Sequence, residues 1–138
     1  MDDQLALRIR LFREGGQVRP EVADFVSAEL AALAARGHEV TEQTAGMLTS
    51  HLMMALTRLV DGEPIEQFLT DEQVAAELAD HPRAVAGARE VAARACEQLG
   101  ATLPDSEVNF LAMHLAVLAG QPSTGHPSPD SPPPRTTP

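Results

Sequence analysis

Several residue types are missing or scarce in this sequence, and each absence narrows the class of protein. There is no Trp and no Tyr, and the four Phe make up only 3% of the chain, so any core must be aliphatic. The single cysteine, Cys96, excludes an internal disulfide and a cysteine-based zinc site. It lies in an alanine-rich helical segment, where we expect a small buried residue.

Long apolar runs are also absent. No stretch approaches the length of about 18 residues that a transmembrane helix needs. The first ten residues, MDDQLALRIR, lack the basic-then-apolar order of a signal peptide. We therefore expect a cytoplasmic protein that makes no contact with a membrane.

Basic side chains are also scarce. The chain has 20 acidic and 10 basic side chains, for a formal charge of -10, and every basic residue is Arg. Such a chain repels phosphate backbones, so we expect no direct binding to nucleic acid.

Composition divides the chain into three parts. Its 138 residues suffice for one small domain. The segment QPSTGHPSPDSPPPRTTP at the end holds seven of the eleven prolines and no side chains for a core. The predicted organisation is an N-terminal helix and turn at 1–19, a helical bundle at 20–119 and a disordered Pro-rich tail at 120–138.

Apolar residues recur at helical spacing, and no segment alternates with period two. Glycines and prolines mark the ends of the helical segments, and Asp80 reads as a cap before Pro82. The fold is predicted to be all-α, with five bundle helices and an additional N-terminal helix. The expected helices cover residues 2–14, 20–36, 42–60, 71–79, 82–99 and 105–119.

Two of the five histidines fall in the middle of apolar helices, where a polar ring needs a partner. His51 lies at the margin of its apolar stripe, and Arg58 follows two turns later on almost the same line, pointing back toward it. A cation there would stabilise a phosphate placed on the ring. Alternatively, Arg58 caps carbonyls or pairs with an acid at the helix end.

His114 shares one line of its helix with an acid and not with a cation, because Glu107 stands seven residues before it. The surrounding segment, VNFLAMHLAVLAG, is apolar around most of its circumference, which predicts cover by a second subunit as well as by its own bundle. A satisfied core histidine is the alternative. A metal site would need His51, His114 and Glu107 to converge with a further ligand, and no short-spaced ligand pair supports one. We expect neither a metal nor another cofactor.

The segments GMLTSHLMMALTRLVDGEPIE at 46–66 and LPDSEVNFLAMHLAVL at 103–118 together resemble the PRD, the PTS regulation domain. The shared features are a His followed seven residues later by Arg (His51 and Arg58), and an acid seven residues before a second His (Glu107 and His114). The resemblance covers roughly residues 20–119. Ser50 stands where many antiterminator PRDs carry Asp.

This resemblance implies a regulatory module and not an enzyme. The implied phosphoacceptors are His51 and His114, and the implied donor is a phosphocarrier or permease domain of the sugar phosphotransferase system. The implied output is control of transcription or of a partner protein by a homodimer. The alternative is a helical dimer that is not phosphorylated and acts as a protein-binding scaffold.

Overall fold

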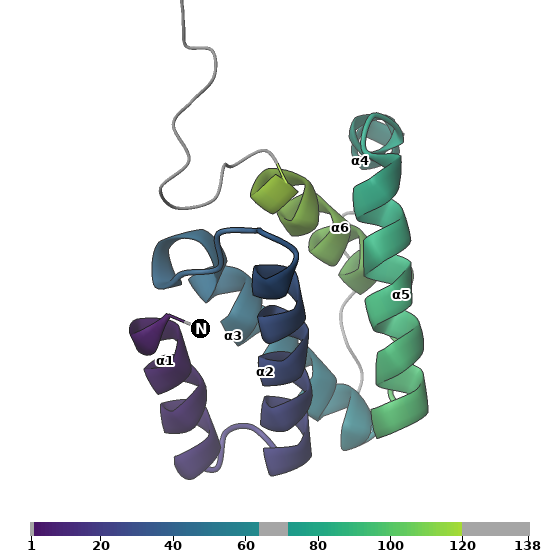
Figure 1. Cartoon of the computed structure of the whole chain (residues 1–138). Coiled ribbons are helices and arrows are strands. Elements are labelled where there is room, and N and C mark those ends of the chain that lie inside the picture. Colours follow the sequence, from purple (N-terminus) through teal and green to yellow (C-terminus); the bar gives the residue numbers. More distant parts are fainter. Residues whose placement is uncertain (1, 64–71, 120–138) are drawn as a thin grey trace, which may run out of the picture.

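The computed structural model describes residues 2–63 and 72–119, and this part of the chain is built from helices with no strand. The predicted all-α fold, with one N-terminal helix before five others, is confirmed (Figure 1). None of these helices is long and apolar enough to cross a membrane. The helices are α1 (Asp3–Glu14), α2 (Pro20–Ala35), α3 (Glu42–Val60), α4 (Glu72–Ala79), α5 (Pro82–Leu99) and α6 (Asp105–Ala119).

The helices form two groups that share one core. Helices α1, α2 and α3 pack on one another, and so do α4, α5 and α6 (Figure 1). The groups meet where α3 packs on α6 and α2 packs on α5. The buried side chains are almost all Leu, Val, Ala and Met, as expected from the scarcity of aromatic residues.

Helix α1 belongs to the same core as the bundle. Its Leu5 and Ile9 are buried against α2 and α3. These two residues are one turn apart, so a single line of α1 faces inward. The predicted tail at 120–138 lies outside the described residues.

Local signals explain where the central helices begin and end. Thr41 and Thr44 form a reciprocal capping box that begins α3, with each side chain bonded to the other residue's backbone N–H. Helix α5 ends at Gly100, whose φ of 69° is a left-handed conformation that favours glycine. The prediction that Asp80 caps α5 is wrong, because His81 occupies the cap position before Pro82.

The expectation for Cys96 is also wrong, because this residue is exposed. The buried line of α5 runs through Ala84, Ala88, Val91 and Ala95. Cys96 is the next residue after Ala95, and one step along a helix rotates a side chain by about 100°. Because α5 is rich in alanine, its sequence does not indicate which face of the helix is exposed.

Candidate functional site

One polar contact between the two groups of helices joins His51 on α3 to Glu107 on α6. The Nε2 atom of His51 lies 2.7 Å from Oε1 of Glu107. The His51 side chain is 32% exposed, whereas that of Glu107 is 2% exposed. The imidazole thus covers a buried carboxylate and keeps part of its own ring at the surface.

The start of α6 accounts for a carboxylate in this position. Glu107 is the third residue of the helix, and its backbone N–H bonds to the carbonyl of Pro104. The first turn of a helix presents unpaired N–H groups and a partial positive charge, which stabilise a negative side chain. Glu107 therefore has support from its own helix as well as from His51.

Phe110 and His114 extend this contact along α6. The ring of Phe110 stacks on His51, with ring centres 3.9 Å apart and planes 24° apart. The same ring meets His114 with centres 4.3 Å apart. His114 Nδ1 donates a hydrogen bond to the carbonyl of Phe110, at 3.1 Å. The two predicted phosphoacceptors therefore lie against one phenyl ring, and we call His51, Glu107, Phe110 and His114 the histidine cluster.

Helical spacing predicted the members of this cluster better than their pairing. It placed Glu107 beside His114, but the carboxylate is the hydrogen-bond partner of His51. The prediction was wrong because spacing compares residues on one helix, while packing of α3 on α6 determines this contact. Phe110 was a neighbour of His114 in the sequence, but nothing in the pattern indicated its stacking on His51.

Arg58, the predicted supporting cation, is exposed in the last turn of α3. Its side chain makes no hydrogen bond or ion pair with another described residue, so its support of a phosphate on His51 stays a prediction. A different arginine contacts Ser50, the residue that precedes His51. Arg8 on α1 donates to the hydroxyl of Ser50, at 2.8 Å, and forms a salt bridge with Glu42.

A glycine in α3 makes room for this second arginine. A Cβ atom at Gly46 would lie 3.4 Å from Nη2 of Arg8 and 3.2 Å from a carboxylate oxygen of Glu42. The Arg8 guanidinium therefore crosses α3 over a residue without a side chain. Its hydrogen bond lowers the pKa of Glu42 below the ordinary value of 4.5. Sequence reasoning missed Arg8, because only the packing of α1 on α3 brings it to this position.

Two further histidines of the described residues, His38 and His81, are not part of the cluster. His38 follows α2 in a turn, and His81 is exposed at the start of α5. His126 lies outside the described residues. Within residues 2–63 and 72–119, no group of three or more His, Cys, Asp or Glu side chains is arranged to hold a metal ion.

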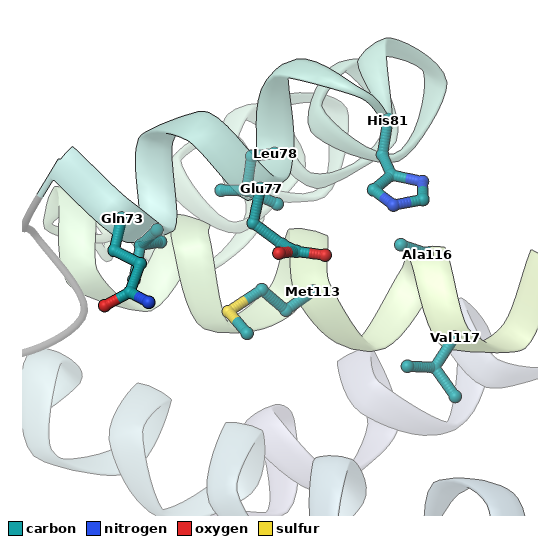
Figure 2. Close-up of a pocket in the computed structure, with 8 residues that line it drawn as sticks. Gln73, Glu77, Leu78, His81, Met113, Ala116 and Val117 are labelled. Carbon is teal, nitrogen blue, oxygen red and sulfur yellow. The ribbon is translucent and has the colours of Figure 1, made fainter.

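A pocket of about 370 Å³ lies between α4 and α6, and neither His51 nor His114 lines it. In Figure 2, Glu77 and His81 project toward the α6 side chains that form its floor. Most of its lining is apolar, and none of the predicted phosphoacceptors takes part in it. Its lining includes Gln73, Glu77, Leu78, His81, Met113 and Val117.

Comparison with known families gives one match. A family model described as the PRD domain matches residues 36–118, which is more than half of the chain. The chain belongs to the PRD family. Neither the curated proteins nor the solved structures contain a match to it.

Family membership assigns the broad class of the molecule. A PRD is a regulatory domain of the phosphotransferase system and not a catalytic one. The matched residues contain the whole histidine cluster, whereas α1 with its Arg8, and also α2, precede them. Two packed helices therefore lie in front of the matched region.

Proposed function

We propose that this PRD is a cytoplasmic receiver of phosphoryl groups on His51 or His114, with a phosphocarrier or permease domain of the phosphotransferase system as the donor. The observation that carries the proposal is the histidine cluster, in which two partly exposed imidazoles share the ring of Phe110 at the contact of α3 with α6. An imidazole nitrogen is a competent nucleophile toward the phosphorus of another phosphohistidine. The donor supplies most of the machinery for phosphoryl transfer.

Phosphorylation here would change the charge at the contact between the two groups of helices. A phosphoryl group adds about -1.5 to -2 charges at neutral pH. On His51 it would arrive next to the buried carboxylate of Glu107, 2.7 Å from the ring. Repulsion between the two groups would favour a different packing of α3 on α6, which is how a local charge changes a larger structure.

We further propose a homodimer as the form in which this change is transmitted to a partner that controls transcription. The apolar circumference of α6 no longer supports the dimer, because α3, α4 and α5 cover most of that helix. The support comes from α3, where exposed Met47 and Met54 flank His51 on one line of the helix. Light scattering should give about twice 14.7 kDa, and a monomer at tens of micromolar would contradict the dimer.

A second candidate function is a scaffold that keeps the PRD fold without phosphorylation. The specific observation in its favour is the position of Glu107, whose negative charge opposes a phosphate on the adjacent His51. In this case the affinity for a partner would not depend on the state of either histidine.

The test is incubation with the general phosphocarrier protein and its kinase, followed by mass spectrometry under conditions that preserve phosphohistidine. His51→Gln and His114→Gln should each remove part of the label, and the double variant should remove all of it. Glutamine keeps a polar side chain in both places. His81→Gln is the matched control, because His81 is exposed and lies outside the cluster. A wild-type protein without label from any cognate donor, or full label on the double variant, would exclude the receiver function and favour the scaffold.

A further inference from the structure

The pocket between α4 and α6 has no role in the proposed function, and its size suits a small molecule. Its volume of about 370 Å³ falls within the range of about 300–1,000 Å³ that is usual for ligand pockets. The apolar part of its lining comes from both helices, with Leu78 from α4 and Met113, Ala116 and Val117 from α6. A ligand that fills this space therefore has an apolar body.

Three polar side chains line the α4 side of the pocket, and they are Gln73, Glu77 and His81. All three are exposed, and Glu77 and His81 project toward the side chains of α6 in Figure 2. Each has an atom that can accept a hydrogen bond, namely an amide oxygen, a carboxylate oxygen or a neutral imidazole nitrogen. The carboxylate of Glu77 only accepts, so a ligand group that pairs with it must donate.

The charges around the pocket favour a cation. Neither α4 nor α6 contains Lys or Arg, and each has an acidic residue in its first turn. The two helices also end on the same side of the pocket, since His81, which follows α4, lies over Ala116 and Val117 near the end of α6 (Figure 2). The C-terminus of a helix carries a partial negative charge, and the last turn of each of these helices has no basic side chain to offset it. The carboxylate of Glu77 adds a full negative charge at the same pocket.

From these observations we propose that the pocket binds a primary ammonium group attached to a small apolar body, as in an arylalkylamine. The ammonium group donates hydrogen bonds to the carboxylate of Glu77, and the apolar body packs on Met113, Ala116 and Val117. A quaternary ammonium ion fits less well, because such ions are recognised by the faces of Phe, Tyr or Trp rings, and the described lining contains none. The inference does not depend on phosphorylation of either histidine.

A ligand in this pocket contacts the helix that carries most of the histidine cluster. On α6, Met113 directly precedes His114, and Val117 follows it by three residues. A ligand bound between α4 and α6 stabilises the packed arrangement of these helices, because it binds only where they lie together. The pocket therefore gives this PRD a chemical input that is separate from phosphorylation.

The experiment uses the full-length protein and 2-phenylethylamine, in about 0.15 M salt so that long-range attraction to the acidic chain is screened. The neutral and anionic compounds of similar shape are 2-phenylethanol and 3-phenylpropionate. An NMR titration followed by the methionine methyl signals should show a change at Met113 and none at Met47 or Met54, which are exposed on α3. The amine should bind about two- to fivefold more tightly than the alcohol, as expected for one exposed ion pair, and 3-phenylpropionate should bind most weakly.

Two pairs of variants test the assigned contacts. Glu77→Gln should remove the preference for the amine over the alcohol, because the amide has no charge. Glu72→Gln should keep this preference, since Glu72 is an exposed residue of α4 outside the described lining. Val117→Arg should abolish binding of the amine, because it places a cation at the pocket. Leu11→Arg is the matched control, since Leu11 is 58% exposed on α1, and it should leave binding unchanged.

Several results would overturn the inference. They are no change at Met113, equal affinities for the three compounds, or a preference for the amine that survives in Glu77→Gln. Binding that requires deletion of residues 121–138 would assign the pocket to the end of the chain. A change of mass in light scattering with Val117→Arg, but not with Leu11→Arg, would assign it to a second copy. None of these results affects the phosphorylation test of the proposed function.

Discussion

Helix α3 is joined to its neighbours by two carboxylates in contrasting surroundings. On one side, Glu107 of α6 is almost fully buried and pairs with His51. On the other side, Glu42 of α3 is 25% exposed and pairs with Arg8 of α1. The first pair joins an imidazole to a carboxylate that solvent does not reach. The second pair is a salt bridge between two partly exposed side chains.

This difference shows that burial decides what each pair contributes. A buried carboxylate that loses its hydrogen-bond donor cannot be compensated by water, so it costs the full desolvation penalty. An exposed ion pair is screened by solvent and salt and contributes little. We therefore expect the contact of α3 with α6 to respond strongly to substitution or modification, and the contact of α3 with α1 to respond weakly.

The largest effect should come from the buried face of α3 that supports both contacts. Leu56 is fully buried, so Leu56→Ala should lower the free energy of unfolding by about 2–5 kcal/mol through lost apolar burial and a cavity. Gln43→Ala is the matched control on the same helix, because Gln43 is exposed. Urea denaturation of both variants checks the prediction, and equal losses would show that α3 is oriented differently.

The next effect should come from removal of the donor to the buried carboxylate. His51→Leu keeps Glu107 covered but removes its hydrogen-bond donor, and it should cost about 1–3 kcal/mol. Adding Glu107→Gln to His51→Leu should recover part of this loss, because no charge then stays buried. Arg58→Ala should change stability by less than about 0.5 kcal/mol, since Arg58 is exposed. Additive losses in the double variant would contradict the direct pairing of His51 with Glu107.

A smaller effect is expected for Arg8→Ala at the contact of α1 with α3. Arg8 lowers the pKa of Glu42, so the pair stabilises the fold above the ordinary pKa of 4.5 and loses this contribution as the pH falls through the lowered value. Arg8→Ala should lower the Tm by less than about 4 °C at neutral pH. The difference from wild type should shrink well below pH 4.5 and at high salt. A difference that grows in acid would contradict the assigned sign.

The smallest effect is expected for deletion of residues 121–138. Their composition offers no core side chains, and the seven prolines lack backbone donors. The free energy of unfolding should change by less than about 0.5 kcal/mol, measured by urea denaturation of the full and the shortened chains. A larger loss would mean that these residues bind to the bundle.

The sequence predicted most of the fold because its signals were local. Apolar spacing and the residues at helix ends gave helix boundaries close to the observed ones, as for Glu42–Val60 and Pro82–Leu99. The errors concern which face of a helix is buried against its neighbours. Cys96 was assigned to the wrong face of α5, because an alanine-rich helix has little contrast between its faces.

The sequence predicted which residues form the candidate site but not how they are arranged. His51, His114 and Glu107 were identified from their positions on apolar helices, and all three lie in the histidine cluster. Their pairing, the stacking of Phe110 and the position of Arg8 depend on contacts between helices that are distant in the sequence. Periodicity along one helix contains no information about such contacts.

The most direct test of the account is a long-range ¹H–¹⁵N correlation spectrum of the imidazoles in the unmodified protein. Under conditions where both rings are neutral, we predict a proton on Nε2 of His51, held by Glu107, and a proton on Nδ1 of His114, held by the carbonyl of Phe110. Glu107→Gln should change the signals of His51 and leave those of His114 in place. If both rings carry their proton on the same nitrogen, or if His51 does not respond to Glu107→Gln, the histidine cluster is not arranged as described and the phosphoacceptor assignment loses its structural basis.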